Sequence, residues 1–175
     1  PSRIRIVAAP GNHDVVRMAE PQPAIPPEFT AKFPSNCTLV ENPCLLNLQG
    51  VRVLMYHGRS FDDMIGLIPG ASYERPGEIM DEMLKRRLLA PSYGMRTPIA
   101  AMKTDRLVIN PLPEILLTGH VHICGVTRYR GVLGVNAGTW QSQTSFQKQM
   151  NIHPTPARAF VIDLQTLQPE VLDFS

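Results

Sequence analysis

Short apolar runs separated by polar turns dominate this chain and predict more strands than helices. Alternating or fully apolar runs predict single strands at residues 3–8, 38–40 and 115–117, and a short strand or a turn at 107–109. Pairs of apolar runs that flank a short polar connection are typical of β-hairpins. The predicted hairpins pair 45–48 with 51–56, 126–129 with 132–135, and 159–164 with 170–174.

Helical periodicity is confined to two places. Ser60 followed by Asp63 has the spacing of a capping box and predicts a short helix that ends at Pro69. Apolar residues recur every three or four positions after Pro76 and predict a longer helix that ends at Pro91. Strands that outnumber helices, with hairpins in the second half, favour an α/β sandwich over a doubly wound sheet.

The composition limits the number of domains, the kinds of partner and the cellular compartment, but it does not indicate a function. The 175 residues are expected to form a single domain, 1–175, with a sizeable core. A net charge of +2 permits nucleic acid as a partner without arguing for it. The odd cysteine count of 3, with no C-x-x-C pair, favours reduced thiols and a cytoplasmic protein. No apolar run is long enough to cross a membrane.

The segment Gly119–His122 carries the most suggestive pair of side chains. It follows the predicted buried strand 115–117, and its histidines, His120 and His122, are two residues apart. On an extended segment, such a pair points to the same side and can converge on one ligand. Taken alone, the pair is more often structural than functional.

Two other predicted strands also end in polar side chains with metal-binding capacity. The first strand leads into Asn12 and His13, although Gly-Asn is also ordinary turn chemistry. The second strand of the first hairpin delivers His57 at its end. Each of these features has a plain structural explanation when it is considered separately.

Together, the strand ends predict a metal site. The candidate ligands are Asn12, His57, His120 and His122. The carboxyl edge of an α/β sheet is where such folds usually build their site. Three imidazoles and an amide suit Mn, Zn or Fe, but they are too few for two ions, which usually share a bridging carboxylate.

These motifs resemble the last three motifs of the calcineurin-like metallophosphoesterases. The matching segments are Gly11–Asp14, the strand-end His57 and Gly119–His122. The resemblance implies that Asn12, His57 and His120 hold one metal and that His122 holds the other. It also implies that His13 contacts the scissile phosphate and stabilises charge or protonates the leaving group. The implied fold is the C-terminal part of a metallophosphoesterase β-sandwich flanked by helices.

Longer matching strings lie at 16–17 with 20–25, 56–63, 83–91, 139–147 and 154–157. They narrow the resemblance to the small subunits of archaeal family D DNA polymerases. Such subunits are proofreading 3′–5′ exonucleases that pair with a large polymerase subunit, so the resemblance implies DNA and that subunit as partners. It implies two divalent metal ions as cofactors, with Mn first and Zn, Fe, Mg or Ni as alternatives. No individual residue is implied to bind the substrate.

The first two motifs of the metallophosphoesterases have no counterpart here. They are Asp-x-His and Gly-Asp-x-x-Asp, and they should precede Gly11. Only ten residues lie before it, and none of them is Asp or His. We therefore expect a fragment, whose missing N-terminal half of the nuclease domain is supplied in cis or in trans, and whose isolated form is inactive.

Three functions stay open at this point. The first is a metal-dependent nuclease subunit. The second is a scaffold or regulatory subunit without catalysis, as in eukaryotic replicative polymerases, although retention of the Asn and His residues favours descent from an active enzyme. The third is another calcineurin-like phosphatase or phosphodiesterase, against which the polymerase-like strings count.

Overall fold

The structure, a computed structural model, describes residues 3–175. It is a mixed α/β fold with a five-stranded sheet and two smaller, two-stranded sheets. No helix within the described residues has both the length and the apolar character of a membrane span. The elements are β1 (Ile6–Ala8), η1 (Pro27–Lys32), β2 (Cys37–Leu39), β3 (Cys44–Leu48), β4 (Val51–Met55), α1 (Phe61–Leu67), α2 (Pro76–Arg86), β5 (Ile115–Thr118), β6 (Cys124–Tyr129), β7 (Val132–Ala137), α3 (Ser145–Gln149), β8 (Arg158–Asp163) and β9 (Gln168–Asp173).

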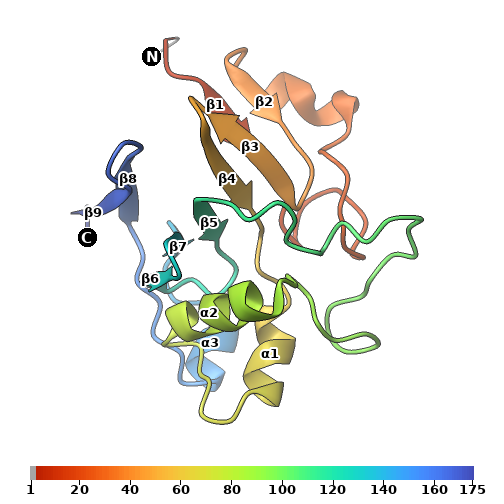
Figure 1. Cartoon of the computed structure of the whole chain (residues 1–175), viewed down its shortest axis with the longest axis vertical. Coiled ribbons are helices and arrows are strands. Elements are labelled where there is room, and N and C mark those ends of the chain that lie inside the picture. Colours follow the sequence, from red (N-terminus) through yellow and green to blue (C-terminus); the bar gives the residue numbers. More distant parts are fainter. Residues whose placement is uncertain (1–2) are drawn as a thin grey trace.

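Parallel pairing defines the centre of the main sheet. Its strand order is β3-β4-β5-β7-β6. The pairs β4–β5 and β5–β7 are parallel, whereas the outer strands β3 and β6 return as antiparallel hairpins. The connection from β4 to β5 runs through α1 and α2 (Figure 1). Because parallel strands end at the same edge, this topology brings the segments after β4 and β5 together.

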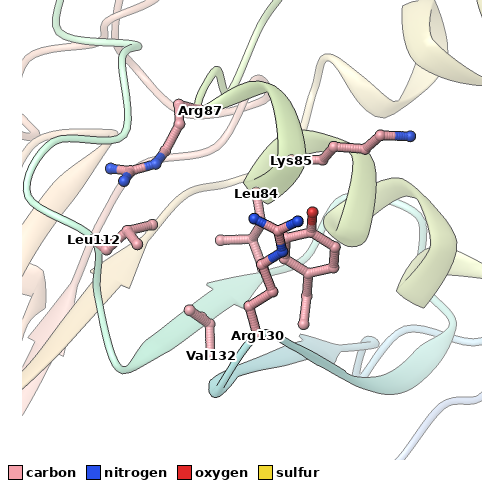
Figure 2. Close-up of a pocket in the computed structure, with 7 residues that line it drawn as sticks. Leu84, Lys85, Arg87, Leu112, Arg130 and Val132 are labelled. Carbon is pink, nitrogen blue, oxygen red and sulfur yellow. The ribbon is translucent and has the colours of Figure 1, made fainter.

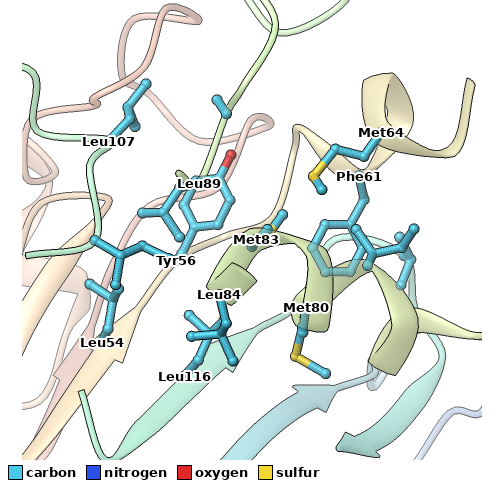
Figure 3. Close-up of a cluster of buried hydrophobic side chains, with 14 of the residues drawn as sticks. Leu54, Tyr56, Phe61, Met64, Met80, Met83, Leu84, Leu89, Leu107 and Leu116 are labelled. Atoms are coloured by element: carbon cyan, nitrogen blue, oxygen red, sulfur yellow. The ribbon is translucent and has the colours of Figure 1, made fainter. Parts of the chain in front are cut away.

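The main sheet has an apolar layer on each face. The larger layer joins α1 and α2 to the sheet and includes Phe61, Met80 and Leu116, all of which are 0% exposed (Figure 3). On the other face, Phe160 and Ile162 of β8 pack against buried residues of β4, β5 and β7. Burying both faces explains why β5 reads as a continuous apolar run rather than an alternating one.

Glycines let α2 lie close to the β6–β7 hairpin. A methyl group on Gly134 would lie 2.6 Å from Cγ2 of Thr127 and 3.3 Å from the sulfur of Met80. A methyl group on Gly125 would lie 2.6 Å from Cγ of Pro76. These distances are shorter than carbon contacts allow, so glycine at both positions is a packing requirement.

The structure confirms the three predicted hairpins and the strand at 115–117. The long helix, however, ends at Arg86 rather than at Pro91, because Arg87 takes a left-handed conformation with φ 57°. Residues 107–109 form only an isolated bridge between Leu88 and Val108. The prediction of a capping box at Ser60 is wrong, since its hydroxyl donates to the carbonyl of Leu89 instead.

Gly134→Ala should destabilise the protein by about 1–3 kcal/mol, because the added methyl group overpacks the α2–sheet contact. Thr127 would have to move, and its hydroxyl donates a 2.7 Å hydrogen bond to Asp81 of α2. Gly66→Ala in α1 is the control, since its methyl group would meet no atom within 4 Å. Urea unfolding should show this control unchanged or stabilised by about 0.5–1 kcal/mol. Equal unfolding free energies for both variants would contradict the packing account.

Candidate metal centre

The parallel register of β4 and β5 places two of the predicted ligands side by side. Met55 of β4 lies opposite Leu117 of β5. Pairing continues past the strands, because the amide of Gly119 donates to the carbonyl of His57 over 3.0 Å. His57 and His120 therefore leave the same edge of the sheet from adjacent strands.

Three predicted ligand side chains meet at this edge. Nε2 of His57 lies 2.7 Å from Oδ1 of Asn12 and 3.3 Å from Nδ1 of His120. The loop that carries Asn12 approaches so closely that a methyl group on Gly11 would lie 2.7 Å from Cε1 of His57. The glycine before Asn12 is thus required for contact between this loop and the His57 ring.

The segment after β5 differs from the predicted extended conformation. His120 and His122 have φ values of 68° and 62°, in the left-handed region that non-glycine residues seldom occupy. Such backbone costs about 1–3 kcal/mol per residue and persists where surrounding contacts hold it, often at functional sites. The prediction that the two histidines lie on an extended segment and point to the same side for that reason is therefore wrong, although His120 does reach the cluster.

His122 occupies a distinct position. Its Nδ1 atom is buried and has no hydrogen-bond partner in the described structure. Its carbonyl accepts a 3.0 Å hydrogen bond from the amide of Thr155, which fixes the backbone. A buried imidazole nitrogen without a partner is costly, and coordination of a cation is one way to satisfy it.

Burial favours the neutral form of two histidines, His57 and His122. Burial, followed by the neighbouring His120, His13 and His122, lowers the pKa of His57 to about 3. Burial also lowers the pKa of His122, with His120 and His13 contributing. Neutral imidazole is the form that binds metals. The side chain of His13, which follows Asn12 directly, is exposed.

The donor set fits a divalent transition metal. Two nitrogen ligands about 2.0–2.1 Å from one tetrahedral ion lie about 3.3 Å apart, and the His57–His120 separation is 3.3 Å. Across residues 3–175, no three His, Cys, Asp or Glu side chains gather as a metal cluster. The site therefore offers two imidazoles and the Asn12 oxygen, with carboxylates needed from elsewhere to balance the charge.

Sequence reasoning missed Asp62 and Tyr73. The Asp62 carboxylate lies 3.2 Å from Nε2 of His120 and accepts a 2.9 Å hydrogen bond from the Tyr73 hydroxyl. Burial raises the pKa of Asp62, but the hydrogen bonds from His120 and Tyr73, together with nearby positive charge, outweigh burial and the net pKa is lowered. Burial and the Asp62 charge raise the pKa of Tyr73 to about 12. Asp62 is thus an ionised acceptor and Tyr73 a protonated donor at neutral pH.

A buried polar network, also missed from the sequence, holds the two ligand-bearing segments together. Its centre is Glu20, which is 0% exposed and accepts a 2.7 Å hydrogen bond from the Tyr56 hydroxyl. Oδ1 of Asn42 accepts a 2.7 Å hydrogen bond from the amide of His57. Nδ2 of Asn42 donates a 2.8 Å hydrogen bond to Oε1 of Gln22. Gln22 in turn donates to the carbonyl of Gly11 over 3.3 Å. These bonds connect the Asn12 loop to the end of β4.

A basic hollow lies away from the cluster, where β7 begins rather than where the central strands end. Figure 2 shows Lys85, Arg87 and Arg130 around it, together with Leu84 and Val132. Its volume of about 110 Å³ is below the 300–1,000 Å³ typical of small-molecule sites. This hollow is therefore smaller than a typical small-molecule site.

Comparison with known families now identifies the chain. A family model that describes the B subunits of DNA polymerases alpha and epsilon matches residues 2–123, which include Asn12, His57 and His120. The chain belongs to this polymerase B-subunit family. The resemblance to polymerase small subunits that the sequence motifs suggested is therefore confirmed.

Individual relatives of the chain are named DNA polymerase II small subunit. The protein from Archaeoglobus fulgidus is 52% identical over 161 residues, or 92% of the chain and 33% of its own length. The protein from Methanocaldococcus jannaschii is 54% identical over 94% of the chain and 28% of its own length. The protein from Pyrococcus furiosus is 43% identical over 100% of the chain and 29% of its own length. The chain thus spans about a third of these relatives or less.

Glu20→Gln should change how stability depends on pH. Burial raises the pKa of Glu20 above 4.5, so the folded state holds a proton that the unfolded state has released. The stabilisation from this carboxyl group is complete below pH 4.5 and is lost as pH rises through the folded pKa. The unfolding free energy of wild type, relative to the variant, should therefore fall as pH rises above 4.5. Parallel denaturation curves for the two proteins at every pH would contradict a raised pKa.

Proposed function

We propose that this chain forms part of the small subunit of an archaeal family D DNA polymerase. In this proposal, it contributes one part of a metal-dependent 3′–5′ exonuclease site that acts on DNA phosphodiester bonds. Membership of the polymerase B-subunit family and relatives that are 42–54% identical support the polymerase assignment. The observation that carries the nuclease assignment is the meeting of Asn12, His57 and His120 within 3.3 Å.

The proposal includes a calcineurin-like metallophosphoesterase fold, of which residues 1–175 are the C-terminal portion. Helices on one face of the main sheet and β8 on the other support this assignment. The Asn12 loop, the end of β4 and the end of β5 then correspond to the last three motifs of that family. The partners that we propose for this protein are the large polymerase subunit, DNA, and the N-terminal half of the nuclease domain.

Asn12, His57 and His120 would hold one divalent ion, and His122 would hold a second. Mn is the first choice, with Zn, Fe, Mg or Ni as alternatives. Two such ions, when bound, supply an activated water and balance the negative charge of the scissile phosphate. Neutral His57 and His122 are ready for this role at neutral pH, because burial lowers the pKa of both.

His13 would act on the substrate rather than on a metal. It follows Asn12 directly, its side chain is exposed, and its charge is among the causes that lower the pKa of His57 and His122. A histidine in this position can donate a hydrogen bond or a proton to the leaving oxygen of the phosphodiester. A positioned acid of this kind contributes about 10²–10⁴-fold to a rate.

The second candidate is a scaffold subunit without catalysis. It draws support from the absence of a three-residue His, Cys, Asp or Glu cluster within residues 3–175. The exonuclease proposal is favoured because a scaffold has no need for Asn12, His57 and His120 to meet, nor for a left-handed backbone at His120. The two proposals differ in whether Mn²⁺ binds and whether its removal stops DNA hydrolysis.

His120→Ala and His13→Ala should separate metal binding from catalysis in the small subunit that carries this chain. His120→Ala removes a ligand and should abolish Mn²⁺ binding to its site in calorimetric titrations. His13→Ala should leave Mn²⁺ binding unchanged but slow 3′–5′ digestion of single-stranded DNA by about 10²–10⁴-fold. Each variant therefore serves as the control for the other.

A wild-type subunit that binds no Mn²⁺ and digests no DNA would favour the scaffold. Equal Mn²⁺ binding by wild type and His120→Ala would remove His120 from the site. If the isolated 175-residue chain digested DNA well, the dependence on carboxylates outside it would be wrong.

A further inference from the structure

Within residues 3–175, Asp62 is the one carboxylate in hydrogen-bond contact with a proposed histidine ligand, and both of its oxygens are engaged. It is the second residue of α1, and Oδ2 lies 3.2 Å from Nε2 of His120. Oδ1 accepts a 2.9 Å hydrogen bond from the hydroxyl of Tyr73, which lies in the connection between α1 and α2. The side chains of His120 and Asp62 are only 14% and 26% exposed, so water competes weakly for this contact.

In the neutral form of His120, which is the form that binds metals, the contact with Asp62 determines which nitrogen carries the proton. An ionised carboxylate accepts hydrogen bonds and donates none, so Nε2 of His120 has to be the donor. A neutral imidazole with a proton on Nε2 carries its lone pair on Nδ1. That Nδ1 atom is the one that faces Nε2 of His57 at 3.3 Å.

We infer that Asp62 is a positioning residue, which holds His120 in the tautomer and orientation that present the Nδ1 lone pair toward His57 and Asn12. The inference rests on the proposed function, since the lone pair matters only if a metal ion binds there. Ligand histidines commonly donate their second N–H to a carboxylate in this way, which fixes the ring and strengthens its basicity.

Tyr73 anchors Asp62 from the side of the core. Its half-buried ring packs against the apolar layer beneath α1 and α2, and its hydroxyl holds Oδ1. Oδ2 is then left to face His120. Tyr73 and Asp62 thereby link the packed core to the imidazole of His120. This link holds the ring in place even though the left-handed backbone of His120 is locally costly.

Asp62→Asn tests this role with little change in shape. Oδ1 of the new amide should keep its bond from Tyr73, so that the NH₂ group replaces Oδ2 and donates to Nε2 of His120. His120 would then move its proton to Nδ1, where it blocks the metal. Mn²⁺ affinity should fall about 10–100-fold, the usual effect of removing such a partner.

The tautomer can be read directly in metal-free protein labelled with ¹⁵N histidine. Long-range ¹H–¹⁵N correlation spectra should show Nε2 of His120 protonated in wild type and Nδ1 protonated in Asp62→Asn. Asp63→Asn is the matched control, because Asp63 is the adjacent carboxylate of α1 and accepts the amides of Arg96 and Thr97 at 2.8 and 2.9 Å. This control should lose stability but keep the wild-type tautomer.

An unchanged His120 tautomer together with unchanged Mn²⁺ affinity in Asp62→Asn would overturn the inference. A tautomer change in Asp63→Asn as large as in Asp62→Asn would also overturn it, because the effect would then be general loosening of α1. Failure of wild type to bind Mn²⁺ would instead overturn the proposed metal function, and the spectra would still decide whether Asp62 sets the tautomer.

Discussion

The parallel pairing of β4 with β5 is the constraint on which the site depends. It sets His57 and His120 at neighbouring strand ends, and the hydrogen bond from the Gly119 amide to the His57 carbonyl extends this register beyond the strands. A slip of one residue would exchange the side chains of β5 between the two apolar layers, so the close packing of each layer opposes such a slip. The core thereby fixes the positions of both imidazoles.

Polar contacts complete what the sheet begins. The Asn12 loop follows β1, which pairs with β2 in a separate small sheet, so the main sheet alone does not place it. Gln22 and Asn42 bind that loop to the end of β4, next to a carboxyl group that is 0% exposed at Glu20. A buried polar network is stabilising only when each of its groups has a hydrogen-bond partner. Because these partners come from both ligand segments, the network fixes the position of one segment relative to the other.

Local patterns predicted much of the fold and led to the candidate site, because both follow from short-range signals. Hairpin periodicity and strand ends led to His57 and His120, and the family match confirmed the polymerase small-subunit resemblance. The left-handed backbone of His120 and His122 was not predictable, since tertiary contacts hold it against its intrinsic cost. Asp62 was missed for a similar reason: its partners lie 58 and 11 residues away in the sequence.

The central claim is that Asn12, His57 and His120 are ligands of one divalent ion. X-ray diffraction at the manganese absorption edge, from Mn²⁺-soaked crystals of the small subunit that carries this chain, tests it most directly. The account predicts an anomalous peak bonded to Oδ1 of Asn12, Nε2 of His57 and Nδ1 of His120. Manganese bound elsewhere, with the 2.7 Å contact between Asn12 and His57 intact and no peak beside it, would contradict the account.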